Sequence, residues 1–409
     1  MVQRRTKLNL GNSNIISVNS KVVRSVNRAM ILNLIRERQP ISRIKISRIS
    51  GLNKSTVSSI VSDLLNEELI YEKMKEDQNI GRNPLDLYLR LGKYFVGAVN
   101  IDSATTRFAI ADIDGSLISK SSVPTESSNP EGFVEFCMDN LLGLCEKSSI
   151  KNLEAIGVSI TGIVDSKNHI VSFAPNIGWE NVNIGAIIRK KCPEISNVSV
   201  GNDAKSSALA ELWFGKHDLN LSNFVFLSIG PGIGSGIVVE NRLLEGEYNA
   251  SGEFGHTTLF EEGNKCVCGN LGCWEAYASE RATVARYISK VNNNSGKSVD
   301  VIMQDIIELA LNKDKVALET LQETGRYLGI GISNIIKSID PHAIIMGGKI
   351  IQVWDVIYPE IIEIVQKRAF SGNAKNINIL PTSLKVRPRL LGAATMAIKT
   401  IFDDYKITA

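Results

Sequence analysis

Residues 252–276 read GEFGHTTLFEEGNKCVCGNLGCWEA and hold the densest chemistry in the chain. Within them, His256, Cys266, Cys268 and Cys273 form the pattern H-x9-C-x-C-x4-C. Three thiolates and one imidazole are a usual ligand set of a closed tetrahedral zinc site. Buried cysteines without a common function would be scattered rather than gathered within eight residues. The stretch therefore predicts one bound Zn²⁺.

The predicted zinc is structural, because four protein ligands leave no open position for a reactive water. Its expected effect is to fix the loop 252–276. Glu253 precedes the first ligand and Glu275 follows the last. The fixed loop therefore presents two carboxylates.

The GE-x-GH start and the C-x-C-G-x-x-G-C-x-E end of this stretch resemble the ROK family of repressors, open reading frames and kinases. The resemblance extends from about Gly97 to the C-terminus. It implies that residues 92–409 form a sugar-binding body with the two-lobed, actin-like (ribonuclease H-like) sugar-kinase fold and a ligand cleft between the lobes. Alternating apolar runs and helical patterns independently predict an α/β body. The expected strands are 94–101, 107–113, 155–160, 198–200, 224–229, 343–346 and 377–380, and the expected helices are 130–147, 204–213, 280–290, 299–311, 315–338, one from 354, and 391–402.

Composition sets the broad class. A chain of 409 residues with 44% apolar and 22% charged residues is typical of a soluble globular protein of two or three domains. No run of 18 apolar residues predicts a membrane span, and no apolar segment follows Arg4 and Arg5 as a secretion signal requires. The other cysteines are too dispersed for a disulfide framework, so a cytoplasmic protein is expected.

Charge is distributed unevenly along the chain. Residues 1–60 contain twelve Lys and Arg but only one acid, Glu37, for a net charge of +11. Since the whole chain carries +3, the remaining 349 residues carry −8. A basic head on an acidic body is typical of a protein that contacts nucleic acid.

The head is predicted to be a flexible basic arm at 1–19 followed by a winged helix-turn-helix DNA-binding domain at 20–91. A first helix runs from Ser20 until Pro40, a second is capped by Ser42 and stopped by Gly51, and a third covers 54–66. Apolar runs near 69–71 and 85–91 predict the two strands of a wing. The expected inner-face residues are Val23, Val26, Ala29, Met30, Leu34 and Ile35 of the first helix, Ile44, Ile46 and Ile49 of the second, and Val57, Ile60, Val61, Leu64 and Leu65 of the third.

The third helix is predicted to recognise DNA. Its outer face carries a cation and short hydroxyl side chains, which can bind base edges and phosphates, although a solvated helix face would have the same composition. Arg82 at the wing tip could reach a minor groove or phosphates. The head also resembles the xylose-repressor branch of the family at Asn27, at ISR 41–43 and at GR-x-P 81–84. The predicted DNA-binding residues are Arg43, Lys54, Ser55, Thr56, Ser58, Ser59 and Arg82.

The resemblance also implies a sugar site. Similar family members bind sugar through an Asn-Asp pair, the Glu and His of GE-x-GH, and the Glu after the last cysteine. These positions are Asn202, Asp203, Glu253, His256 and Glu275 in this chain. Carboxylates accept hydrogen bonds from paired hydroxyls, and a zinc-bound imidazole is held in one direction by the metal. The alternative is that Glu253 and Glu275 are surface acids beside a structural zinc.

The nucleotide motifs depart from those of the family's kinases. Those kinases have D-x-G-G-T, whereas this chain has NIDSATT at 100–106, with Ser103 and Ala104 in place of the glycines. A Cβ obstructs close approach of the backbone to a phosphate. In the glycine series 230–236, Pro231 removes a backbone donor. Gly347 and Gly348 resemble glycines on the adenosine side, although any tight turn would use such a pair.

The resulting hypothesis is a non-enzymatic, sugar-responsive repressor of carbohydrate-utilisation genes, most similar to the xylose-repressor and N-acetylglucosamine-repressor branch. Xylose is the favoured inducer, with glucose or another sugar as alternatives. The expected partners are a palindromic DNA operator and a second copy of the chain, with a tetramer as the alternative. Two other hypotheses stay open: an ATP-dependent ROK sugar kinase with an added DNA-binding head, and a regulator controlled by a protein partner that keeps a vestigial sugar site.

Overall fold

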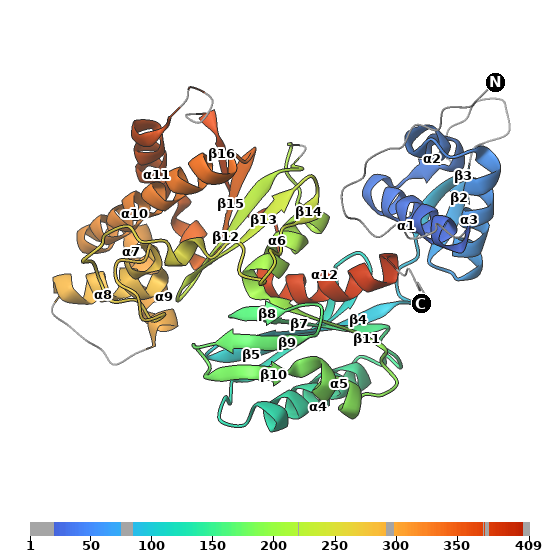
Figure 1. Cartoon of the computed structure of the whole chain (residues 1–409), viewed down its shortest axis with the longest axis horizontal. Helices are drawn as coiled ribbons and strands as arrows, with labels where there is room; N and C mark the ends of the chain where they lie inside the picture. The colour runs from blue at the N-terminus through green and yellow to red at the C-terminus, as the bar shows by residue number, and fades with distance from the viewer. Residues whose placement is uncertain are drawn as a thin grey trace, which may run out of the picture. The chain divides into compact units, whose positions relative to one another are not determined.

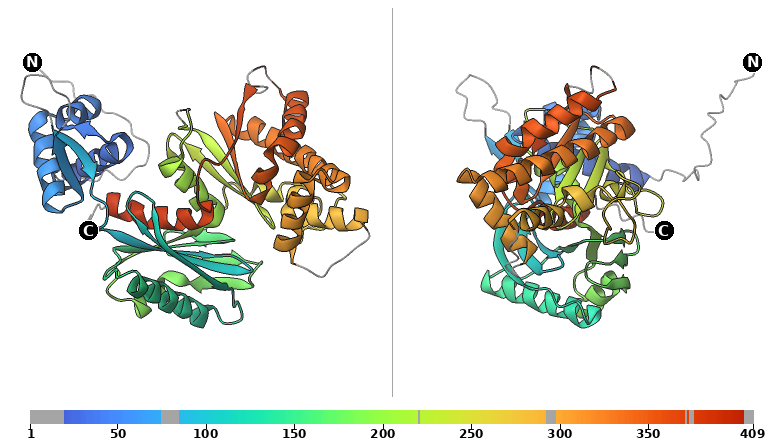
Figure 2. Two further views of the ribbon diagram at one scale, coloured as in Figure 1. Left: turned by 180° about the vertical axis from the view of Figure 1, so that it is seen from behind. Right: turned by 90° about the vertical axis from the view of Figure 1, so that its left-hand side faces the viewer.

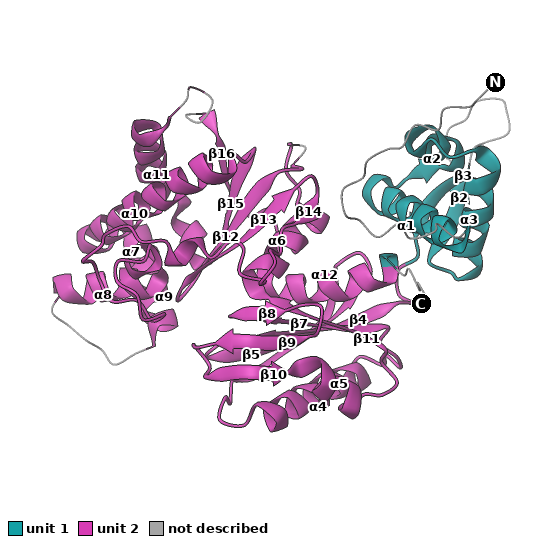
Figure 3. Ribbon diagram, viewed as in Figure 1, with its two compact units in different colours: residues 1–90, 402–409 teal, residues 91–401 magenta. Residues whose placement is uncertain are grey.

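The computed structural model describes residues 20–74, 85–219, 221–291, 298–370, 372 and 376–403. The chain divides into two compact units (Figure 3): residues 1–90 with 402–409 form the first, and residues 91–401 form the second. The predicted arm at 1–19 and the predicted wing tip with Arg82 lie outside the described residues.

Unit 1 begins with three helices, and two of them start and end as their sequences predict. The side chain of Ser42 accepts a hydrogen bond from the Lys45 amide, and Gly51 ends the second helix with a φ of 72°. The side chain of Asn53 caps the third helix by accepting from the Thr56 amide at 2.7 Å. The helices are α1 (Ser20–Arg38), α2 (Arg43–Ser50) and α3 (Lys54–Asn66).

The sheet of unit 1 has the strand order β1-β3-β2. β2 (Ile70–Met74) and β3 (Leu85–Leu89) pair antiparallel, with Ile70 opposite Leu89, and β1 (Ile41–Ser42) adds to the free side of β3. The two predicted strands are therefore present, and the sheet gains a short third strand.

The predicted apolar faces of the first two helices are partly wrong. Val23 and Val26 of α1 are 43% and 46% exposed, whereas the unpredicted Ile31 and Leu32 are fully buried. In α2 only Ile46 is buried, and Ile44 and Ile49 are exposed. A helix on the surface of a small unit buries only one narrow stripe, so apolar residues at neighbouring angles stay in solvent.

Unit 2 contains two five-stranded sheets with the same topology (Figure 1). In each sheet, three consecutive strands pair antiparallel. A fourth strand pairs parallel with the first of them, and a fifth pairs parallel with the fourth. Lobe 1 contains β4 (Phe95–Ile101), β5 (Thr105–Asp112), β6 (Leu117–Pro124), β7 (Ala155–Ile160) and β11 (Asn197–Asn202), and lobe 2 contains β12 (Phe224–Ile229), β13 (Ile233–Val239), β14 (Arg242–Leu243), β15 (Ala343–Gly347) and β16 (Asn378–Pro381). This repeated α/β arrangement is the predicted actin-like fold.

Helices cover both sheets, and most of them lie where the sequence predicts. The limits of α4, β7, β12 and α9 agree with the predicted ranges. Lobe 1 carries α4 (Pro130–Lys147), α5 (Ile184–Lys191) and a small sheet of β8 (Ile163–Asp165), β9 (Ile170–Ala174) and β10 (Trp179–Asn183); lobe 2 carries α7 (Glu275–Ala278), α8 (Glu280–Val291), α9 (Val299–Leu311), α10 (Lys315–Ile339), α11 (Trp354–Arg368) and the 3₁₀ turns η1 (Phe254–His256) and η2 (Lys349–Val353). Among the described residues, no helix combines the length and apolarity that a membrane span needs.

Two helices lie across the lobes (Figure 2). α6 (Asp203–Phe214) follows the last strand of lobe 1 but packs on the lobe 2 sheet, where Gly236 contacts Ala208. α12 (Pro388–Phe402) follows lobe 2 but packs on the lobe 1 sheet, where Gly157 contacts Ala393. The two helices meet at Gly392, where a Cβ would lie 2.5 Å from the carbonyl carbon of Ser206. The crossing therefore requires a residue without a side chain.

Candidate functional site

The four predicted metal ligands come together. One ligand atom from each of His256, Cys266, Cys268 and Cys273 lies within 4.8 Å of the others. The Cys266 Sγ is 3.7 Å from the His256 Nδ1, and the Cys268 and Cys273 sulfur atoms are also 3.7 Å apart. Since Zn–S bonds are about 2.3 Å long, two sulfur ligands of a tetrahedral zinc ion lie roughly 3.7 Å apart. The four residues therefore fit a tetrahedral metal ion.

Backbone hydrogen bonds bring these ligands together. The Leu259 amide donates to the Gly272 carbonyl at 2.7 Å, and the Trp274 amide donates to the Thr257 carbonyl at 2.9 Å. These bonds hold the strand-like segment before Cys273 against the segment after His256. The first and last ligands are consequently adjacent although they are 17 positions apart in the sequence.

Glu275 joins this loop to the glycine series. Its Oε1 lies 3.0 Å from the Cys266 Sγ and 3.8 Å from the His256 Nδ1. Its Oε2 accepts from the Ile233 amide at 3.3 Å. Glu275 is 8% exposed. A predicted sugar ligand is thus also a structural link between the metal loop and the start of β13.

Charges from both lobes act on the carboxyl of Glu253. Burial raises the pKa of its carboxyl, while His256 and Lys205 lower that pKa and Asp203 and Glu275 raise it further. Charges change a pKa appreciably only over short distances. Four of the five predicted sugar residues therefore lie in one electrostatic neighbourhood, with Asp203 contributed by lobe 1 and the other three by lobe 2.

Asn202 differs from the other four because its side chain caps α6. Its Oδ1 accepts from the amides of Ala204 and Lys205 at 2.9 and 3.0 Å. Its Nδ2 donates to the Gly162 carbonyl at 2.8 Å. One amide hydrogen is left for a ligand. Asn202 therefore positions Asp203, the first residue of the helix, in addition to any contact with sugar.

The protein binds one of the two oxygens of the Asp203 carboxylate. Its Oδ2 accepts from the Thr161 hydroxyl at 3.1 Å and forms an ion pair with Arg389 at 3.2 Å. The residue is 4% exposed. Within the described residues, Oδ1 has no hydrogen-bonding partner from the protein. Asp203 therefore has one oxygen fixed by the protein and one available to a hydroxyl of a ligand.

Arg389 is a central residue that sequence reasoning missed. Besides Asp203, it binds the Asp102 Oδ2 at 3.2 Å and the Ser228 Oγ at 3.1 Å. A Cβ on Gly230 would lie 2.7 Å from the Arg389 Nη2. The guanidinium thus occupies the space between two segments that were predicted as damaged phosphate motifs, the one beginning at Asp102 and the one beginning at Gly230.

The predicted positions in the first of these motifs need a correction. Counted from Asp102, the two glycines of D-x-G-G-T correspond to Ala104 and Thr105 rather than to Ser103 and Ala104. Thr106 then corresponds to the threonine, and it is fully buried with its hydroxyl 2.9 Å from that of Thr125. Both glycine positions still carry a Cβ, so the physical argument is unchanged.

Two further charged residues of unit 2, Lys205 and Glu280, are buried. The Lys205 Nζ donates to the carbonyls of Glu245 and Asn249 at 3.0 and 2.8 Å, and burial lowers the pKa of its amine. Burial raises the pKa of Glu280 to about 7, against the opposing effects of Arg389 and Lys349. A lysine or glutamate in a helix is normally solvated. No sequence signal therefore distinguished these two, although Lys205 follows the Asn-Asp pair by only two residues.

Six of the seven predicted DNA-binding residues lie on two helices of unit 1, and Arg82 lies outside the described residues. Lys54, Ser55 and Ser59 of α3 are exposed, and Thr56 and Ser58 are half-buried. Arg43 at the start of α2 forms an ion pair with Glu72 at 2.8 Å. The Ser59 hydroxyl accepts from Arg24 at 3.0 Å. The first turns of α3 are thus accessible, whereas Arg43 would have to leave Glu72 to bind a phosphate.

Comparison with known proteins gives one consistent result. A sequence model of the ROK family matches residues 96–400. The chain is 34% identical to a xylose repressor of Bacillus spizizenii, over 94% of this chain and 98% of that protein. Its structure is similar to that of a ROK family transcriptional regulator, a homologue of the Escherichia coli MLC protein, with a TM-score of 0.80 and 25% identity over 93% of this chain and 97% of that one. A ROK glucokinase from Streptomyces griseus, solved with glucose and AMPPNP, matches with a TM-score of 0.67 and 28% identity over 75% of this chain and 99% of that one.

Proposed function

Because this chain belongs to the ROK family, we propose that it is a sugar-responsive transcriptional repressor of carbohydrate-utilisation genes rather than a sugar kinase. The observation that carries the choice is the ion pair of Arg389 with Asp203 and Asp102. Similarity over nearly the whole chain to a protein named a xylose repressor supports the same choice.

Unit 1 is proposed to bind the operator as a winged helix-turn-helix domain. The α2–α3 pair with its Gly51 turn, the β2–β3 hairpin and the excess of cations in residues 1–60 support this assignment. The first turns of α3 would enter the major groove, with Lys54 on a phosphate and Ser55, Thr56, Ser58 and Ser59 near base edges. Arg43 and Arg82 would add contacts to the phosphate backbone of the DNA.

The sugar is proposed to bind at Asp203, Glu253, His256 and Glu275, with Asn202 supporting the helix that presents Asp203. Convergence of these residues from both lobes supports the proposal, as does the free Oδ1 of Asp203. Xylose is the favoured inducer because a similar protein is named a xylose repressor; glucose or another sugar would use the same hydroxyl-directed groups. The metal is proposed to be one structural Zn²⁺ that orients His256 and Glu275.

Kinase activity is disfavoured because Arg389 occupies the space beside Asp203. A phosphoryl-transfer site needs backbone amides and cations free to hold the triphosphate. Here the Arg389 guanidinium is engaged by Asp102, Asp203 and Ser228, and it lies against Gly230. Ala104, Thr105 and Pro231 further restrict approach of the backbone to phosphate.

Repression and induction are proposed to follow from two states of a homodimer on a palindromic operator. Sugar binds more tightly to one arrangement of the lobes, and that difference in affinity supplies the free energy that changes operator binding. The third hypothesis, control by a protein partner, does not require the converged sugar residues.

Two assays on the full-length protein test the proposal. In an operator mobility-shift assay, xylose, glucose and N-acetylglucosamine are titrated separately, and one of them is expected to release the DNA. In a coupled assay with ATP and the same sugars, no ADP formation above the protein-free rate is expected. Turnover at an ordinary sugar-kinase rate would support the kinase alternative, and release by none of a wider sugar panel would support control by a partner.

A further inference from the structure

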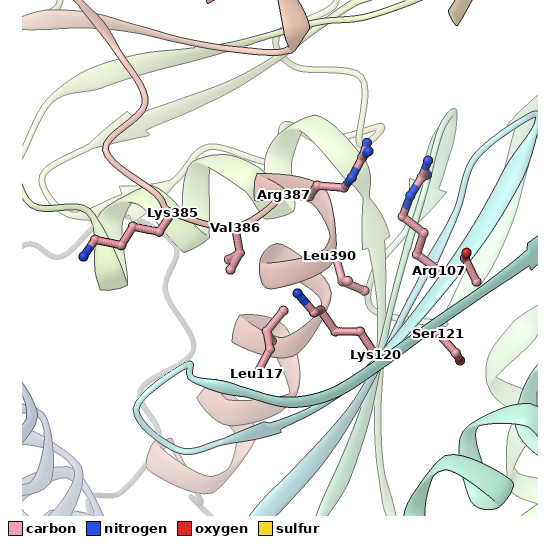
Figure 4. A pocket seen from close by; sticks show the side chains of 9 residues that line it. Arg107, Leu117, Lys120, Ser121, Lys385, Val386, Arg387 and Leu390 are labelled. Atoms are coloured by element: carbon pink, nitrogen blue, oxygen red, sulfur yellow. The ribbon is translucent and has the colours of Figure 1, made fainter. Parts of the chain in front are cut away.

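A cavity of about 540 Å³ lies in unit 2 between the β5–β6 hairpin and the segment that leads into α12 (Figure 4). Its lining residues are Arg107, Leu117, Lys120, Ser121, Ser122, Lys385, Val386, Arg387 and Leu390. None of them is a predicted sugar residue, and none belongs to the cluster of Asp102, Asp203, Ser228, Gly230 and Arg389. The cavity therefore adjoins this cluster without sharing a residue with it, since the charges of Asp102 and Arg389 both affect the pKa of Arg107.

The lining of this cavity is strongly cationic. Four of its residues, Arg107, Lys120, Lys385 and Arg387, are Lys or Arg, and none is an acid. Across the described residues, none of these four forms an ion pair. Many other cations of the body do: Lys191 pairs with Asp139, Arg326 with Glu360 and Lys349 with Asp300. Since residues 61–409 carry a net charge of −8, an unpaired cluster of four cations is not a consequence of overall composition.

The two arginines lie close to one another. Arg107 is half-buried on β5 and donates to the Thr105 carbonyl at 3.3 Å. Burial lowers its pKa, and the like charge of Arg387 lowers that pKa further. Figure 4 shows both guanidinium groups extending toward the same side of the cavity. The carboxylates of Asp102 and Asp300 oppose these effects on the pKa of Arg107, but among the described residues neither forms an ion pair with it. Like charges repel each other, and a bound anion would convert that repulsion into attraction.

The cavity also adjoins the start of a long helix. α12 begins at Pro388, directly after Arg387, and runs for 15 residues. The positive end of a helix dipole favours an anion, which adds to the effect of the four side chains. Leu117, Val386 and Leu390 supply apolar surface beside the charges.

We propose that this cavity binds a small phosphate-bearing organic molecule. Arg107 and Arg387 would bind the phosphate group, Lys120 and Lys385 would add positive charge around it, and the hydroxyl of Ser122, which lies opposite Arg107 in the β5–β6 pair, would donate to its oxygens. The apolar lining residues would contact the organic part. A concave site of this volume is in the usual range for small molecules, whereas the phosphate backbone of a nucleic acid needs an extended basic surface. The proposal does not depend on the repressor function.

The test is calorimetric titration of the full-length protein with inorganic pyrophosphate as the probe, at about 0.15 M salt, where exposed charges more than about 8 Å apart are largely screened. The double variant Arg107→Gln/Arg387→Gln is expected to bind pyrophosphate at least tenfold more weakly than the native protein. Arg242→Gln/Lys337→Gln is the matched control, because it removes two exposed, unpaired cations of the same unit. This control is expected to bind like the native protein, and thermal melting checks that both variants fold.

Two outcomes would overturn the proposal. Equal affinity for pyrophosphate in all three proteins would mean that pyrophosphate does not bind in the cavity. Equally weakened binding in both variants would mean that affinity depends only on the overall charge of the protein. Competition supplies a second readout: random-sequence duplex DNA should not displace pyrophosphate from the native protein. Displacement by such DNA, lost in Arg107→Gln/Arg387→Gln, would identify the cavity as a nucleic-acid contact and contradict the small-molecule assignment.

Discussion

The guanidinium of Arg389 lies 3.2 Å from the carboxylate of Asp203, although the two residues are 186 positions apart along the chain. Arg389 comes from the first turn of α12, and Asp203 is the first residue of α6. The same guanidinium binds Asp102 after β4 and Ser228 near the end of β12. One side chain thus links the proposed sugar site, the altered phosphate segment and both sheets of the body.

Replacing Arg389 should destabilise the body. Arg389→Gln would leave Asp102 and Asp203 without their cation, and loss of one partner from a buried pair costs about 3 kcal/mol. The measurement is the free energy of unfolding in urea. Arg326→Gln is the control, because its partner Glu360 belongs to a pair in which the arginine side chain is 49% exposed. A loss no larger than that of the control would mean that the Arg389 pair contributes little.

Asp203→Asn should abolish the response to sugar and leave operator binding intact. The substitution keeps the size of the side chain but replaces an acceptor of hydroxyl hydrogen bonds with a donor. The readout is sugar-dependent release in a mobility-shift assay. Asp102→Asn is a matched control, since it also removes a carboxylate from Arg389 at 3.2 Å but lies outside the proposed sugar residues. Loss of the response in both variants would attribute it to the Arg389 network instead of to sugar contact.

Lys54→Ala should weaken operator binding without changing sugar affinity. An exposed cation at the start of α3 that contacts a phosphate contributes counterion release, so the slope of log K against log salt should fall by about 1. Sugar affinity is measured separately by calorimetry. Lys337→Ala, an exposed cation of the body, should leave the slope unchanged. An unaltered slope for Lys54→Ala would remove Lys54 from the DNA contact.

Removal of the metal should lower stability and sugar affinity together. Cys273→Ser deletes a buried ligand, and structural metal sites contribute directly to folding free energy. Metal content by atomic emission is expected to fall from about one zinc per chain to none, with a lower melting temperature. Cys145→Ser, outside the cluster, should keep the metal. If the protein as purified from zinc-containing medium contains no metal, the assignment is wrong.

Glu280 should give stability a specific dependence on pH. Its folded pKa of about 7 lies above the ordinary value of 4.5, so the folded state binds more protons between those values. The free energy of unfolding should therefore fall as pH rises from about 4.5 to about 7, by at most about 3 kcal/mol from this group, and should not change further above pH 7. In Glu280→Gln this decline should be smaller, and in the exposed Glu261→Gln it should match the native protein. An identical decline in all three would exclude Glu280 as its source.

The sequence predicted what depends on neighbours in the chain. Periodicity located α3 and α9 at their observed limits, the predicted caps Ser42 and Gly51 bound α2, and ligand spacing predicted that Cys266 and Cys273 share one site. Burial was harder to predict, because the inner stripe of α1 is set by packing against α3 and β3 and falls on Ile31 and Leu32. Arg389 could not be found, since its role arises from Asp102 and Asp203, which only the folded chain places beside it.

The exchange of α6 and α12 determines how the body can be divided. Each sheet is covered by a helix that belongs, along the chain, to the opposite lobe, and the two helices touch at Gly392 and Ser206. A fragment ending after β11 would contain the first sheet without its covering helix, and the complementary fragment would have the reverse defect. Neither half is an independent folding unit, so residues 91–401 should be produced and unfolded as a single cooperative piece despite containing two sheets.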